Sequence, residues 1–135
     1  MRPSLVLVSA IGAALLAPCL ADDSKLSPAA QQGKRLYEFH CQSCHGETGR
    51  GDGPTADVLT VKPVNLTRLA RRNGGEFPLE RVVRSIDGRE RAPAHGSAMP
   101  VWGLDFQDPS SDVYQEGEVK RRIDNIIEYL KTIQK

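Results

Sequence analysis

The chain has 135 residues, which is enough for one compact domain and too few for two domains of ordinary size. Its 18 Lys and Arg residues nearly balance its 17 Asp and Glu residues. The net charge of +1 therefore lacks the basic surplus that a nucleic-acid-binding protein needs, and we expect no nucleic-acid partner.

The first 21 residues have the pattern of an export signal. Arg2 precedes an uncharged apolar run from Ser4 to Ala17, and Cys19-Leu20-Ala21 places small residues at the two positions that a signal peptidase inspects. The run is shorter than the roughly 20 apolar residues of a membrane-spanning helix. We expect residues 1–21 to be a cleavable signal peptide and residues 22–135 to be the mature, periplasmic domain. The alternative is an uncleaved anchor, which would associate the protein with a membrane.

A capped helix is predicted at the start of the mature domain. Ser27 supplies a hydroxyl N-cap, a proline follows it at the first helical position, and apolar residues recur at helical spacing as far as Cys41. Four glycines make residues 46–54 a loop. We expect a short helical turn at 55–59 and an extended segment at 62–66.

Two further helices are predicted in the second half. Residues 78–86 place their apolar side chains on one side, and the Pro- and Gly-containing residues 88–100 are irregular. The last helix begins near residues 116–118, and its apolar stripe consists of Val119, Ile123, Ile126, Ile127, Leu130 and Ile133. No strand pattern is visible, so the fold class is all-α with long loops. Short helices and few aromatic residues make a thin core, which a large buried cofactor would complete.

Cys41-Gln42-Ser43-Cys44-His45 is the pattern of covalent haem attachment. Two thiols three residues apart on a helical turn can form thioethers with the two vinyl groups of a porphyrin. His45 is then placed beneath the iron as the proximal ligand. A thioredoxin-like redox pair would need surrounding strands, and a zinc site would need two further ligands, for which only His40 and His95 remain.

Three features of the mature chain together resemble the class I, mono-haem c-type cytochromes. They are Gly33-x-x-Leu36-Tyr37 ahead of Cys41–Gly46, the segment Met99-Pro100-Val101-Trp102-Gly103, and a closing amphipathic helix that contains Tyr129. The resemblance implies a small cytochrome c fold, with three to five helices and long loops around one covalently bound haem c. It also implies that the first and last helices cross, with Gly33 meeting Tyr129.

The same resemblance implies that Met99 is the distal iron ligand, because that family places a methionine just before a proline in this part of the chain. A lone methionine is usually core filler, but the Gly- and Pro-rich surroundings favour ligation here. His95 is the alternative, and would give bis-histidine iron at a lower potential. We therefore expect Cys41, Cys44, His45 and Met99 to bind the haem, with His45 and Met99 as the iron ligands.

Several residues are expected to tune the site. The family orients its proximal histidine through a proline carbonyl, for which Pro54 and Pro63 are candidates, with Pro63 preferred. Trp102 is expected near the haem edge or in the core, and His40 in packing at the surface. One arginine is expected to pair with a haem propionate; the candidates are Arg68, Arg71, Arg72, Arg81, Arg84, Arg89 and Arg91.

The resemblance implies an electron-transfer protein rather than an enzyme. The leading hypothesis is a single-electron carrier between redox partner proteins whose identity the sequence does not specify. One alternative is a cytochrome subunit of a dehydrogenase or oxidase complex. A ligand-binding haem sensor is a further alternative, which would need an open sixth coordination position, and Met99 argues against it.

Overall fold

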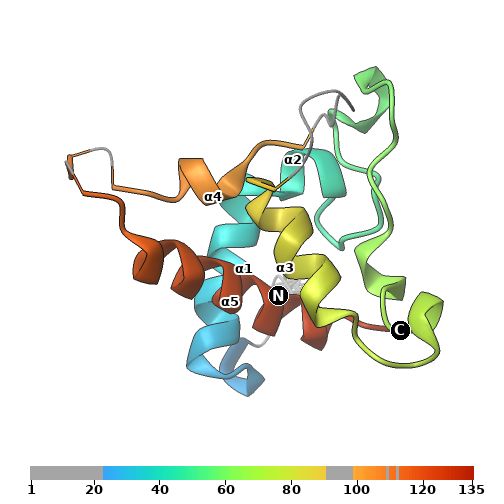
Figure 1. Ribbon diagram of the computed structural model, residues 1–135. Coiled ribbons are helices and arrows are strands. Elements are labelled where there is room, and N and C mark those ends of the chain that lie inside the picture. The colour runs from blue at the N-terminus through green and yellow to red at the C-terminus, as the bar shows by residue number, and fades with distance from the viewer. Residues whose placement is uncertain (1–22, 91–98, 109, 112) are drawn as a thin grey trace, which may run out of the picture.

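A computed structural model describes residues 23–90, 99–108, 110, 111 and 113–135. Its helices are joined by long loops and short 3-10 turns, as Figure 1 shows. They are α1 (Pro28–His40), α2 (Gln42–His45), α3 (Leu79–Asp87), α4 (Trp102–Asp105) and α5 (Glu116–Thr132). These residues contain no strand, so the predicted all-α class is confirmed. The predicted signal at 1–21, His95 and Arg91 lie outside the described residues.

Helix α1 begins as the sequence predicts. The backbone N–H of Ala30 donates to the Oγ of Ser27 over 3.1 Å, which satisfies one of the amides that a helix leaves unpaired at its start. The helix ends at His40, and the N–H of Cys41 still donates to the carbonyl of Tyr37 over 2.8 Å. The haem-attachment motif is therefore continuous with the last turn of α1.

Helices α1 and α5 cross with their backbones in contact, as can be followed in Figure 1. A Cβ atom placed on Gly33 would lie 1.8 Å from the carbonyl oxygen of Asn125, so only glycine fits there. The predicted crossing is thus present, and α5 comes closest to Gly33 one helical turn before Tyr129. The nearest atoms of α5 to Gly33 belong to Asn125 and Ile126, and the ring of Tyr129 packs on Tyr37, with centroids 5.3 Å apart.

The core forms around this crossing. Helix α3 packs on α5, and the apolar stripe of α5 is buried from Val119 to Leu130; Ile133 follows the helix and is half-buried. Helix α4 was not predicted, because four residues are too few to show a helical period. It contributes Phe106, just after its end, as a fully buried side chain. Two other predicted helical segments are present. The turn predicted at 55–59 is a 3-10 helix at Ala56–Val58, and the helix predicted at 78–86 is α3.

The C-terminus is attached to the middle of the chain. The side-chain amide of Gln134 donates to the carbonyl of Leu66 over 2.9 Å and accepts from the N–H of Ala70 over 3.0 Å. The N–H of Lys135 donates to the carbonyl of Thr67 over 2.8 Å. These bonds hold the turn at Leu66–Arg68, which begins at the last residue of the predicted extended segment, against the end of α5.

The helix crossing gives a direct test. The substitution Gly33→Ala is expected to lower the free energy of unfolding by about 2 kcal/mol or more, because the added methyl group must push the two backbones apart. Gly117→Ala is the matched control: nothing lies within 4 Å of its Cβ position, so alanine should be neutral or stabilise α5 by up to about 1 kcal/mol. Urea unfolding followed by circular dichroism measures both. Equal stabilities for the two variants would contradict the close crossing.

Candidate functional site

The cysteines of the motif lie where α1 passes into α2. Cys41 is the residue between the two helices and is buried against the core, whereas Cys44, on α2, is half-buried. The two thiols are not joined by a disulfide. Burial, together with a smaller effect of the neighbouring Cys44, raises the pKa of Cys41 to about 12. A redox-active Cys-x-x-Cys pair needs a lowered thiol pKa, so this environment argues against a thioredoxin-like site.

A zinc site finds no support in the described part of the chain. Within it, no three His, Cys, Asp or Glu side chains are close enough together to hold a metal ion. His40 is engaged elsewhere: its ring packs edge-on against Phe39, Trp102 and Phe106, with centroids 4.8, 5.0 and 5.1 Å away. The packing role predicted for His40 is therefore confirmed.

The glycine-rich loop after the motif folds back along α2. The N–H groups of Gly51, Gly53 and Thr55 donate to the carbonyls of His45, Cys44 and Ser43, over 2.8, 3.2 and 3.0 Å. These carbonyls belong to the end of a helix and would otherwise have no partner within it. The loop therefore fixes the backbone that carries Cys44 and His45.

Two glycines allow this arrangement. Gly46 and Gly51 have φ values of +80° and +84°, in the region that side chains rarely adopt. A Cβ on Gly51 would lie 2.3 Å from the carbonyl oxygen of Pro63. The carbonyl of Gly46 accepts a 2.5 Å hydrogen bond from the buried hydroxyl of Tyr37, which joins the end of the motif to α1.

His45 is oriented by a backbone carbonyl, but not by a proline carbonyl. Its Nδ1 lies 3.3 Å from the carbonyl oxygen of Val64, so the preference for Pro63, and the alternative Pro54, are both wrong. The carbonyl of Pro63 faces Gly51 instead. No sequence signal marks Val64, because every residue has a carbonyl and only the path of the loop selects one.

This contact determines which nitrogen of His45 can bind a metal. A carbonyl only accepts, so Nδ1 carries the proton and Nε2 keeps its lone pair. Burial lowers the pKa of His45, and the hydrogen bond to Val64 opposes that shift only in part. The imidazole is therefore held neutral, as an iron ligand must be.

Met99 is far from the attachment motif in the sequence and lies between α3 and α4. Its half-buried side chain packs against the hydrophobic core, as does that of Trp102. The indole ring of Trp102 stacks on Phe106, with centroids 5.3 Å apart and planes inclined by 24°. This aromatic stack gives Trp102 the core role that was one of its two predicted roles.

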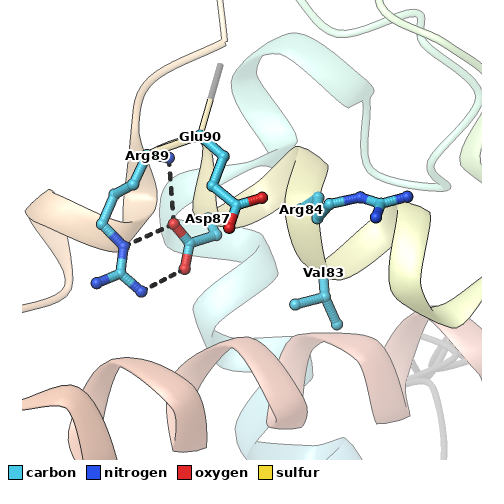
Figure 2. A pocket seen from close by; sticks show the side chains of 5 residues that line it. All are labelled: Val83, Arg84, Asp87, Arg89 and Glu90. Atoms are coloured by element: carbon cyan, nitrogen blue, oxygen red, sulfur yellow. Dashed lines mark hydrogen bonds and ion pairs between the residues drawn. The ribbon is translucent and has the colours of Figure 1, made fainter.

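Two of the arginines that were candidates for a propionate partner differ in whether a carboxylate already pairs with them. A cavity of about 410 Å³ lies at the end of α3, and Figure 2 shows the residues that line it: Val83, Arg84, Asp87, Arg89 and Glu90. Arg89 is paired with Asp87, whereas Arg84 forms no ion pair with any described residue. Of these two candidates for a propionate partner, Arg84 is therefore the one with an unused charge.

The side chains present fit a covalently attached haem. Two free thiols stand three residues apart on a helical turn, followed at once by a neutral imidazole with an available Nε2. Cys41 and Met99 contact the same hydrophobic core, which suits a cofactor with a large apolar ring.

Comparison with known proteins identifies the family. The family model described as "Cytochrome C oxidase, cbb3-type, subunit III" matches residues 28–110, which is more than half of the chain. No curated protein and no solved structure matches the chain. The matched range includes the whole of the attachment motif and Met99. The family implies covalently bound haem c and an electron-transfer module that is not an enzyme by itself. The chain therefore belongs to the c-type cytochrome family of cbb3-type cytochrome c oxidase subunit III.

Proposed function

We propose that the protein is a periplasmic single-electron carrier with one haem c, attached through Cys41 and Cys44 and ligated by His45 and Met99. The observation that carries the proposal is the contact between Nδ1 of His45 and the carbonyl of Val64, which leaves Nε2 of a neutral ring to bind iron. Haem supplies the one-electron chemistry when it is bound. The chain contributes the ligands and the surroundings that set the reduction potential.

The proposed ligands have distinct effects on that potential. The carbonyl of Val64 increases the basicity of the His45 ring, which favours the ferric state. The thioether of Met99 is a soft, neutral donor, which favours the ferrous state and raises the potential. A saturated iron suits outer-sphere electron transfer, because no position remains open to an exogenous ligand.

Export is the second part of the proposal. Residues 1–21 form the cleavable signal and residues 22–135 form the haem domain. In the described part of the chain, none of the helices combines the length and apolar character that a bilayer crossing requires.

A cytochrome subunit of an oxidase or dehydrogenase complex is the second candidate, favoured by the description of the matching family as an oxidase subunit. Purification from the native host under mild detergent distinguishes the two functions. A carrier should elute alone at the size of its own domain, whereas a subunit should elute with an oxidase or dehydrogenase. Either outcome keeps the haem site proposed here.

Visible spectra test the distal ligand. We expect a c-type reduced spectrum and, in the ferric protein, a methionine-to-iron charge-transfer band that the substitution Met99→Ala abolishes. His95→Ala is the control, since it removes the competing candidate ligand, and should leave that band unchanged. A wild-type protein without that band, or a band that survives in Met99→Ala, would assign the sixth position to another residue.

An intact mass tests export and haem number together. We expect the protein matured in an exporting host to begin at Asp22 and to carry the mass of one haem. The double variant Cys41→Ala/Cys44→Ala should have the same start without the added mass. A mass that includes Met1 would indicate a retained anchor, and a second haem mass would contradict a mono-haem protein.

The orientation of His45 gives a prediction for the potential. Gly51→Ala places a methyl group against the Pro63 carbonyl and should displace the adjoining Val64 carbonyl from Nδ1. The weaker hydrogen bond should raise the reduction potential, on the order of tens of millivolts, because it makes the imidazole a poorer donor to ferric iron. Gly74→Ala is the matched control, since its φ of +70° brings similar strain but nothing lies within 4 Å. Equal potentials in both variants would remove the role of Val64.

A further inference from the structure

We propose that Arg89 is a positioning residue for Met99: an ion-pair network centred on Arg89 fixes the segment that carries the distal ligand. The network consists of Asp87, Arg89, Gly103, Tyr114 and Glu116, and is called the Arg89 network below. This inference rests on the proposed ligation by Met99. The Arg89 network would determine how firmly that ligand is held.

The guanidinium of Arg89 binds two carboxylates. Its Nε and Nη2 donate to the two oxygens of Asp87 over 2.7 and 2.6 Å, a bidentate pair that Figure 2 shows at the end of α3. Its Nη1 and Nη2 donate to the two oxygens of Glu116 over 3.0 and 3.2 Å. Because Glu116 is the first residue of α5, Arg89 joins the end of α3 to the start of α5.

Tyr114 and Gly103 connect this ion-pair cluster to α4. The guanidinium of Arg89 lies over the ring of Tyr114, 5.2 Å from its centroid, and also donates to the Tyr114 hydroxyl. That hydroxyl donates in turn to the carbonyl of Gly103 over 3.2 Å. Gly103 is the fourth residue after Met99, so the network contacts the short segment that begins with the proposed ligand.

The contact at Gly103 leaves no room for a side chain unless the Asp87–Arg89 pair moves. A Cβ there would lie 2.5 Å from Oδ1 of Asp87 and 2.6 Å from Nε of Arg89. Gly103 is itself buried, and α4 has no side-chain cap of its own. The backbone of α4 therefore lies directly against the Asp87–Arg89 pair, whose position determines where α4 can lie.

This network differs from the ordinary surface ion pairs of the chain. The Asp87 side chain is only 19% exposed, and the Arg89 guanidinium holds the pKa of that carboxyl below its ordinary value, so the pair stays ionised. By contrast, Arg121 pairs with Glu118 within one face of α5, and such a pair joins no two elements. A bidentate guanidinium shared by two carboxylates is among the stronger charge-assisted contacts.

The Arg89 network should affect how firmly Met99, the proposed distal ligand, is held on the iron. A neutral thioether binds ferric iron weakly, so its retention depends on the protein segment that holds it in place. Loosening α4 should therefore ease displacement of Met99 by an added ligand before it affects the helix crossing of α1 and α5. The rate at which cyanide binds to the ferric haem protein reports this displacement.

The experiment compares Arg89→Gln with Arg121→Gln in the haem-loaded protein. Arg89→Gln should accelerate cyanide binding about tenfold, which corresponds to about 1.4 kcal/mol, and Arg121→Gln should leave the rate within about twofold of the wild type. Arg89→Lys should fall between them, because an ammonium keeps the charge but cannot form the bidentate pair. Gly103→Ala should accelerate binding without any change of charge, because it displaces the same pair.

Loss of global stability is separated from loss of positioning by Ser27→Ala. This variant removes the cap of α1, far along the chain from Met99, and should lower the denaturation midpoint with no change in the cyanide rate. Equal acceleration in Ser27→Ala and Arg89→Gln at equal stability would overturn the proposal, as would a wild-type rate in Arg89→Gln.

The two proposals fail in different ways. A wild-type protein with no methionine-to-iron band would remove the ligand and the positioning role together. A band that is present in the wild type and abolished in Met99→Ala, combined with a wild-type cyanide rate in Arg89→Gln, would remove only the role of Arg89.

Discussion

The contact between Gly33 and the backbone of Asn125 is the constraint on which the other parts of the structure depend. It lets α1 and α5 approach until backbone meets backbone, and the apolar stripe of α5 is buried around that point. One turn further along α1, Tyr37 packs on Tyr129 and donates to the carbonyl of Gly46. The crossing is thus coupled to the position of the haem-attachment motif, which begins where α1 ends.

Backbone groups, more than side chains, shape the proximal side of the site. The loop after the motif donates three N–H groups to the end of α2, and its glycines adopt conformations that other residues avoid. The chain then passes close enough to Gly51 to bring the Val64 carbonyl to the His45 ring. Proton position and ring orientation at His45 therefore follow from the path of the loop.

The segment that carries Met99 is held by contacts of another kind. Packing of Trp102 and Phe106 against the ring of His40, at the end of α1, fixes one side of α4, and the Arg89 network lies against its backbone at Gly103. The two proposed iron ligands thus lie on segments with different attachments: His45 on a helix fixed by backbone hydrogen bonds, Met99 on a segment fixed by packing and ion pairs. Ion pairs are more sensitive to salt than backbone hydrogen bonds, so ionic strength acts on the two sides unequally.

The sequence by itself determined the long helices and the attachment motif, because both are local. Capping at Ser27 and the apolar period of α5 depend on residues a few positions apart, and Cys41, Cys44 and His45 are consecutive in one turn. Only the tertiary structure decided which residue of α5 meets Gly33, which carbonyl orients His45, and that Arg89 joins three separate elements. These are contacts between segments 14 to 92 residues apart (Arg89 with Gly103, Gly33 with Asn125), and they depend on close backbone approach. The sequence does not show which backbone segments approach each other, because every residue has the same backbone and a glycine does not indicate which segment it contacts.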